Sequence, residues 1–268
     1  MSDFEKFFSK RESELSERFI EEGYIIAKVE NISMLNSIRQ FVSRCAARHL
    51  NKELKEPADF LNSAHRFLKI DQLNGLRLHI IEELNSEDWF RVGYFHLAQN
   101  LLETIVGNEL VMQAKVGLSI QLPKDDSSLL PVHADVWSGD SPFEVVVWLP
   151  LVDCFGTKTM FLLPPAPTRD LHARFKEFEH ETSEHIYKSI ESKLSWIKID
   201  YGEVLIFNQN LPHGNRINEE PESRWSMNCR FKSVFSPYRD KKLGEFFKPI
   251  TLRAASRIGL KYRYPEIR

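Results

Sequence analysis

Two short fragments of this sequence carry side chains that can hold a transition metal. The first is His133-Ala134-Asp135, and the second contains His213. Two imidazoles and one carboxylate form a three-ligand set that occupies one face of an octahedral metal and leaves the opposite face open. Neutral imidazole and a hard carboxylate suit Fe(II), and the open positions admit a chelating co-substrate and O2. His133, Asp135 and His213 therefore predict a non-haem iron site.

A candidate anion site follows the second histidine. Arg224 comes eleven residues after His213 and carries a planar, permanently charged group that suits a carboxylate. On an extended strand Arg224 shares one face with Ser226, Asn228 and Arg230, while the residues between them are apolar. A buried guanidinium needs an anion, so an interior polar face predicts a carboxylate site at Arg224 and Ser226. A solvent-exposed polar face is the alternative.

The metal-site prediction depends on the combination of motifs. His133 and Asp135 are two residues apart, so their side chains point to the same side of an extended segment. His213 lies 78 residues after Asp135, a gap that a jelly roll accommodates because distant strands become neighbours. An HxD fragment alone is common by chance, and the later His-Gly and Arg224 make the pattern more specific. The alternative is that these are buried polar residues that bond only to the protein.

The elements that must position these residues change character along the chain. Helices are predicted over 34–50 and 85–107, where apolar residues recur at helical spacing. From residue 115 the apolar residues alternate with polar ones, which predicts half-buried β-strands. The predicted strands are 115–122, 144–151, 157–163 and 224–234, together with a hairpin of 195–199 and 203–207.

The order of these elements predicts an α+β fold. Many short strands with proline-rich turns indicate a sandwich or barrel, and a cupin-like jelly roll fits the number of strands. We expect one domain over residues 1–268, with mainly helical support at 1–112, a jelly-roll core at 113–235 and a C-terminal extension at 236–268. Residues 168–195 are predicted to form a helical insertion in the core.

Composition and charge limit the class of protein. The chain has 268 residues, of which 42% are hydrophobic and 28% charged, as in globular proteins. A formal net charge of -2 predicts no general affinity for nucleic acid or membranes. Three cysteines without CxxC spacing fit a reducing compartment. Since the sequence shows no signal-peptide pattern and no apolar run of ~18 residues, we expect a cytoplasmic protein.

The charge is unevenly distributed along the chain. Residues 230–268 contain eleven Lys and Arg against three Asp and Glu, so the rest of the chain is acidic. A basic segment on an acidic body favours an anionic substrate. Solvated surface charge is the alternative, because no block of like charges is longer than two residues.

The metal and anion motifs together resemble those of the Fe(II)/2-oxoglutarate-dependent dioxygenases, whose fold is a double-stranded β-helix, a form of jelly roll. Residues 147–153 and 160–164, a Trp-x-x-Leu-x-Asp strand and a strand ending in proline, resemble the phytanoyl-CoA hydroxylase-like branch. The resemblance covers roughly residues 115–233. The helical N-terminus and residues 138–143 also resemble an uncharacterised bacterial subgroup found among surface-carbohydrate genes.

This resemblance implies roles for the singled-out residues. The two histidines and Asp135 would hold Fe(II), and Arg224 with Ser226 would bind the distal carboxylate of 2-oxoglutarate. Trp148 would lie beside this co-substrate, and Gln121 would be a further polar contact. The family's usual Pro-Gly-Ser after the third strand is replaced here by residues 163–167, which puts the family's substrate contacts in doubt.

The resemblance also implies an activity. It predicts a dioxygenase that uses O2 and 2-oxoglutarate to hydroxylate an unactivated C–H bond of a small molecule, with release of succinate and CO2. Asp135 predicts oxygenation, because related halogenases lack this carboxylate. We expect Trp137, Ser138, Asp140 and Arg230 to contact the substrate, with loop or barrel stabilisation as the alternative. The bacterial subgroup favours a carbohydrate or nucleotide sugar as substrate.

Two other functions compete with this one. The first is a non-catalytic jelly-roll protein that binds a sugar or an acidic metabolite. A pure binding protein has no reason to keep the triad and Arg224 together. The second is a zinc hydrolase that uses the same three ligands, which would need a nearby general base and has no role for Arg224 and Ser226.

Overall fold

Two antiparallel sheets form the centre of the molecule in the computed structural model, which describes residues 6–266. The larger sheet has the strand order β1-β7-β4-β9-β2-β10, and β3 pairs with the first half of β9. The smaller sheet has the order β6-β5-β8. The strands of the larger sheet are β1 (Tyr24–Lys28), β2 (Leu110–Gln113), β3 (Gly117–Gln121), β4 (Val145–Pro150), β7 (Glu203–Asn208), β9 (Arg224–Ser233) and β10 (Phe247–Thr251). Those of the smaller sheet are β5 (Phe161–Leu162), β6 (Ser195–Trp196) and β8 (His213–Gly214).

The two sheets enclose an apolar layer. Val146 and Trp148 of β4 and Phe207 of β7 lie in the same buried cluster as Met160 and Leu162 beside the smaller sheet. Alternation along β4 and β7 sends every second apolar side chain to this side. The arrangement is the predicted jelly roll with its two sheets face to face.

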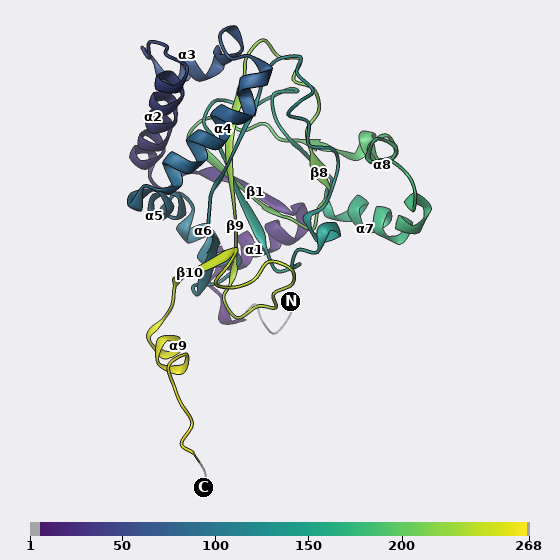
Figure 1. Cartoon of the computed structure of the whole chain (residues 1–268). Helices are drawn as coiled ribbons and strands as arrows, with labels where there is room; N and C mark the ends of the chain where they lie inside the picture. The colour runs from purple at the N-terminus through teal and green to yellow at the C-terminus, as the bar shows by residue number, and fades with distance from the viewer. Residues whose placement is uncertain (1–5, 267–268) are drawn as a thin grey trace.

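Helices cover the outer face of the larger sheet (Figure 1). The apolar face of β9, predicted to pack against a helical layer, does so through Trp225, Met227, Cys229 and Phe231. Trp225 Nε1 also donates a hydrogen bond to the Leu61 carbonyl of the layer at 2.9 Å. The helices of this N-terminal part are α1 (Lys10–Glu22), α2 (Ile32–His49), α3 (Pro57–Asn62), α4 (Ile70–Asn85), α5 (Asp88–His96) and α6 (Gln99–Ile105).

Two predicted elements differ from the structure. The helix predicted over 85–107 is two helices, α5 and α6, because the Leu97 carbonyl accepts a hydrogen bond from the Glu30 N–H instead of continuing the helix. The hairpin predicted from 195–199 and 203–207 is wrong, since β6 pairs with β5 whereas β7 pairs with β1 and β4. The turn at Gly202, with φ of 96°, carries the chain from one sheet to the other.

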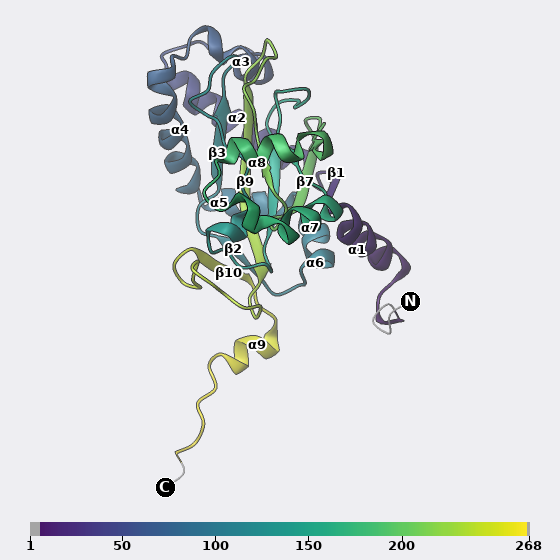
Figure 2. The ribbon, with the colours of Figure 1, turned by 90° about the vertical axis from the view of Figure 1, so that its right-hand side faces the viewer.

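The segment between β5 and β6 covers the outer face of the smaller sheet. It contains α7 (Pro165–Ala173) and α8 (Ser183–Ile190), which lie on the side of the molecule opposite α2–α5 (Figures 1 and 2). Phe161 and Leu163 share a buried cluster with Leu171, Tyr187 and Ile190 of this segment. The helical segment therefore supports the strand that precedes it.

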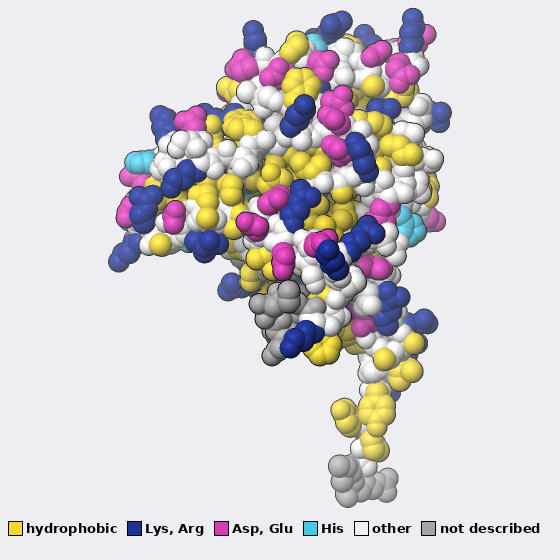
Figure 3. Space-filling view, turned by 180° about the vertical axis from the view of Figure 1, so that it is seen from behind, with side chains coloured by type: hydrophobic (Ala, Val, Ile, Leu, Met, Phe, Trp, Pro, Cys, Tyr) yellow, Lys and Arg dark blue, Asp and Glu magenta, His cyan; other side chains and the backbone are white. Residues whose placement is uncertain are grey.

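The chain ends in an arm that projects from the body (Figure 1). It follows β10, the last strand at one edge of the larger sheet, and contains α9 (Ala254–Gly259), which has no buried residue. Figure 3 shows hydrophobic side chains along this arm. Among residues 6–266, no helix combines the length and the apolar character that a bilayer crossing requires.

Candidate metal centre and anion site

The two histidines of the predicted triad are joined through their backbones. The His133 N–H donates to the His213 carbonyl at 3.0 Å, and the His213 N–H donates to the His133 carbonyl at 2.7 Å. Their rings lie with centroids 4.3 Å apart. This pairing brings together two residues far apart in sequence, as the jelly-roll prediction requires. The Asp135 N–H in turn donates to the Gln209 carbonyl at 3.2 Å, which places the carboxylate beside the histidines.

The three predicted ligands converge on one point. One ligand atom from each of His133, Asp135 and His213 lies within 4.8 Å of the other two. The Nδ1 atoms of His133 and His213 lie 2.8 Å and 2.9 Å from the carbonyls of Pro131 and Leu211. Such a contact requires the proton on Nδ1, which leaves the Nε2 lone pair of each ring for a metal.

The environment of His213 keeps its imidazole neutral. Burial, and to a smaller extent the neighbouring His133, lower the pKa of His213 to about 4, against the opposing effect of Asp135. A neutral imidazole is the form that binds a metal. At neutral pH this residue is therefore ready to act as a ligand without losing a proton.

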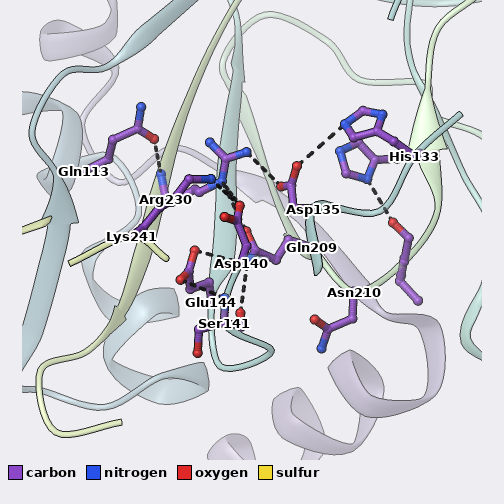
Figure 4. Close-up of polar contacts among 12 residues, drawn as sticks. Gln113, His133, Asp135, Asp140, Ser141, Glu144, Gln209, Asn210, Arg230 and Lys241 are labelled. Atoms are coloured by element: carbon purple, nitrogen blue, oxygen red, sulfur yellow. Dashed lines mark hydrogen bonds and ion pairs between the residues drawn. The ribbon is translucent and has the colours of Figure 1, made fainter. Parts of the chain in front are cut away.

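Asp135 is held by an arginine from β9 (Figure 4). The Arg230 Nη2 lies 3.0 Å from Asp135 Oδ2, while Asp135 Oδ1 lies 3.6 Å from His133 Nε2. The Arg230 contact is an ion pair without the alignment of a hydrogen bond. One carboxylate oxygen thus faces the arginine, and the other faces the histidines.

A polar network also holds the Nε atom of Arg230, whose Nη2 atom faces Asp135. Its Nε donates to Gln209 Oε1 at 3.2 Å and lies 3.5 Å from Asp140 Oδ2 (Figure 4). Asp140 is buried and also pairs with Lys241. Gln209 donates in turn to the Ser141 carbonyl at 2.9 Å. Asp140, predicted as a substrate contact, is therefore engaged with two cations of the protein.

The predicted anion site contains a buried arginine without a carboxylate partner. Arg224 donates from Nη1 to the Thr159 carbonyl at 2.9 Å and from Nη2 to Ser119 Oγ at 3.0 Å. Burial lowers the pKa of Arg224, and only the Cys154 thiol opposes this. Among the described residues nothing bonds to Arg224 Nε or Ser226 Oγ, and both are buried. These unpaired groups leave room for an anionic ligand.

Gln121 lies next to this arginine. It pairs in register with Arg224 across β3 and β9. Its Nε2 donates to the Arg216 carbonyl at 2.5 Å, and its buried Oε1 has no partner in the described part of the chain. An amide with a free acceptor is suited to a ligand that donates a hydrogen bond.

One cavity of about 600 Å³ connects the triad with the arginine. Its walls include the three predicted metal ligands, Arg224 and Arg230. Trp148, predicted to lie beside a co-substrate, also lines this cavity. The predicted metal ligands and the predicted anion site therefore share one partly open cavity of the size that small-molecule sites have.

Of the four residues predicted to contact the substrate, only Arg230 lines the cavity, since Asp140, Trp137 and Ser138 do not. Trp137 packs against His172 and Phe175 of the helical segment, and Ser138 is exposed; neither lines the cavity. The cavity instead includes Asn74 and Arg77 of α4, which belong to none of the predicted site motifs. Their contribution depends on how α4 packs beside β3, so no short motif could have indicated it.

Comparison with known proteins supports the fold. No family model matches this sequence, and no curated protein matches it significantly. Among solved structures, the non-heme monooxygenase ThoJ in complex with Ni superposes with a TM-score of 0.57 at 15% identity, covering 94% of this chain and 89% of ThoJ. The alpha-ketoglutarate-dependent epimerase SnoN from nogalamycin biosynthesis gives 0.51 at 15% identity, covering 85% of each chain.

A third solved structure carries ligands. HygX from Streptomyces hygroscopicus, with nickel and 2-oxoglutarate bound, gives a TM-score of 0.52 at 12% identity, covering 88% of this chain and 90% of HygX. Other structures of SnoN and HygX contain nogalamycin RO and hygromycin B, respectively. At these identities the likeness establishes a shared jelly-roll fold with N-terminal helices, as predicted.

Proposed function

We propose that this chain is an Fe(II)- and 2-oxoglutarate-dependent oxygenase that hydroxylates a C–H bond of a small molecule. The observation that carries the proposal is the combination of three converging metal ligands with a buried arginine in one cavity. When bound, Fe(II) and 2-oxoglutarate supply the oxidation of a C–H bond by O2, with succinate and CO2 as by-products.

The donor set fits iron. Two imidazoles with free Nε2 atoms and one carboxylate oxygen form the facial triad of non-haem Fe(II) oxygenases. The backbone contacts at both Nδ1 atoms set the direction of the rings, and Arg230 sets that of Asp135. These contacts hold the ligands in place before the metal arrives.

The anion site fits the distal carboxylate of 2-oxoglutarate. Arg224 Nε and Ser226 Oγ are buried donors without partners, and a carboxylate accepts from both kinds of group. Such a ligand removes the cost of a buried guanidinium that has only neutral acceptors. We also assign Trp148 and Gln121 to the surroundings of this co-substrate, since one lines the cavity and the other lies beside Arg224.

The competing zinc hydrolase finds less support. Among residues 6–266, Asp135 is the only carboxylate that lines the cavity, and the triad already uses it. A hydrolase would need a second group as general base. A binding protein without a metal would in turn leave three converging ligand atoms without a role.

For the substrate we propose a small organic molecule. The cavity volume is typical of small-molecule sites, and SnoN and HygX are known with small molecules bound. A carbohydrate or nucleotide sugar, the class that the sequence resemblance favours, is the starting point for a substrate search.

Anaerobic titration of the metal-free protein with Fe(II) and then 2-oxoglutarate tests this function. We expect a weak visible charge-transfer band that requires both additions, because 2-oxoglutarate must chelate the iron. Arg224→Ala should weaken 2-oxoglutarate binding about tenfold or more through loss of a charge-assisted contact. A band that never forms, or one that Arg224→Ala leaves unchanged, would contradict the proposal.

A further inference from the structure

One face of helix α4 lines the cavity described above. Ile70, Leu73, Asn74 and Arg77 all contribute, at the i, i+3, i+4 and i+7 positions that share a helix face. The first two residues of this face are apolar, and the last two are polar. The face thus offers two kinds of contact along about 10 Å of helix.

Arg77 is a cation without a counter-charge in the cavity. Its Nη2 donates to Asn74 Oδ1 at 2.7 Å, and it forms no ion pair with any carboxylate of the described residues. The cavity's one carboxylate, Asp135, already pairs with Arg230. Three arginines line the cavity in the described part of the chain. Arg230 pairs with Asp135 and Arg224 is assigned to the co-substrate, so only Arg77 has no anionic partner.

The apolar part of the cavity has exposed edges. Ile70 is 57% exposed and Leu130 is 51% exposed, and both line the cavity. Leu73 is buried and Leu129 is half-buried, and both also line the cavity. An apolar ligand that covers these side chains would remove their surface from water, at about 25 cal/mol per Å² buried.

We propose that the α4 face binds the substrate, and that the substrate is an amphipathic anion. Arg77, with Asn74 beside it, would hold a carboxylate or a phosphate ester, and Ile70, Leu73 and Leu130 would contact an apolar body. The inference rests on the proposed oxygenase function and narrows its substrate class. A neutral sugar would offer Arg77 hydrogen-bond acceptors but no counter-charge.

The basic C-terminal segment does not supply this anion site. Of residues 231–266, none lines the cavity, and the arm projects away from the body (Figure 1). The sequence predicts an anionic substrate from the basic C-terminal segment. We now attribute the preference for an anion to Arg77 of α4 instead. Arg230 lines the cavity but is already paired with Asp135 and Asp140.

Calorimetric titration of the Fe(II)- and 2-oxoglutarate-loaded protein under anaerobic conditions tests the inference. The probes are octanoate, octyl phosphate, octanol and octyl glucoside, which share one chain and differ in the head group. We expect one of the two anions to bind at least tenfold more tightly than the neutral probes. Comparison of the two anions distinguishes a carboxylate from a phosphate substrate.

The variants identify the residue responsible. Arg77→Gln should weaken anion binding about tenfold or more and leave octanol binding unchanged, whereas Arg77→Lys should retain most of the affinity. Arg44→Gln, at an exposed arginine of α2 that does not line the cavity, is the matched control and should have no effect.

The charge-transfer band separates the two proposals. If the band forms in every variant but the anions bind no better than the neutral probes, or bind Arg77→Gln as well as the unaltered protein, the α4 inference is wrong and the oxygenase proposal stands. If uridine diphosphate glucose binds more tightly than both octyl anions, the claim that the substrate has an apolar body is wrong. If no band forms in any of the proteins, the proposed function itself fails.

Discussion

Arg230 shows how one side chain could serve the proposed metal centre without being a ligand. It contacts Asp135 at 3.0 Å and is held on its other side by Asp140 and Gln209. The contact fixes which carboxylate oxygen faces the histidines. Second-sphere contacts of this kind orient the ligands and tune metal affinity. The residue was predicted to touch the substrate, and its contacts favour a positioning role.

This role predicts a defect in iron binding. Arg230→Gln should weaken Fe(II) binding to the metal-free protein by about 10–100-fold, because Asp135 loses its orienting partner. The effect on 2-oxoglutarate affinity at saturating iron should be smaller, since Arg224 is untouched. Titration with Fe(II), followed by titration with 2-oxoglutarate, measures the two effects separately.

Two control variants accompany this measurement. Arg239→Gln removes an exposed arginine and should leave both affinities unchanged. Arg230→Lys keeps the charge but loses the planar group, so we expect an intermediate iron affinity. Unaltered iron binding in Arg230→Gln would show that the Asp135 contact does not position the ligand.

At the scale of elements, the close approach of β8 to the segment before His133 shapes the site. A Cβ at Gly214 would lie 2.6 Å from the Leu130 carbonyl oxygen and 3.0 Å from the Phe161 ring. The same stretch contains the backbone pairing between the two histidines. A glycine next to His213 is therefore a packing requirement of the backbone around the proposed metal centre.

The prediction is that Gly214→Ala lowers the free energy of unfolding by about 1–3 kcal/mol, because backbone cannot move aside as a side chain can. Gly75→Ala in α4 is the matched control. A Cβ there has nothing within 4 Å, and alanine in a helix interior should raise stability by about 0.5–1 kcal/mol. Urea unfolding measures both variants, and equal stability of the two would contradict this account.

Elements whose structure is set by neighbouring residues could be predicted from the sequence, and those set by distant residues could not. Strict alternation of polar and apolar residues from Arg224 to Phe231 predicted both faces of β9. The apolar face packs in the core beneath the helices, and the polar face contributes to the cavity. The break between α5 and α6 depends on a hydrogen bond from Glu30, far away in sequence. Partners of short strands are likewise non-local, so the 195–207 hairpin was predicted wrongly.

The same distinction between local and distant determinants applies to the residues of the candidate site. The HxD spacing and the Arg224 position are local patterns, and the structure brings both into one cavity. Arg77 joins them only because α4 lies beside β3, a tertiary contact that periodicity within α4 does not specify. Trp137 and Ser138 lie close to the HxD in sequence, yet they belong to the helical turn Asp135–Ser138 and do not line the cavity.

On the scale of the whole molecule, the jelly roll and its helical layer are self-contained, and the C-terminal arm is an appendage. Helix α9 has no buried residue, and Ile258 and Tyr264 are mostly exposed. By contrast Phe247 of β10 is fully buried against Val111 and Val234. The boundary between body and arm therefore lies after β10.

Truncation tests this boundary. A chain that ends at Arg253 should unfold within about 0.5 kcal/mol of the full chain and keep its iron and 2-oxoglutarate binding, since it loses only surface groups. A chain that ends at Phe246 also loses β10 and the buried Phe247, which should cost about 3 kcal/mol or more. Urea unfolding of both chains measures the difference, and a large loss in the first would place the arm within the folded body.

The backbone pairing of the two histidines has a consequence for stability. The pairing of His133 with His213, 80 positions later in the sequence, closes a loop of the chain, and the proposed metal site would exist only while that loop is closed. An ion bound there would act as a reversible crosslink whose binding energy adds to the folding energy. By mass action, each tenfold rise in free iron above its dissociation constant would add about 1.4 kcal/mol to the stability of the fold. Iron supply would then govern the amount of folded protein as well as its activity.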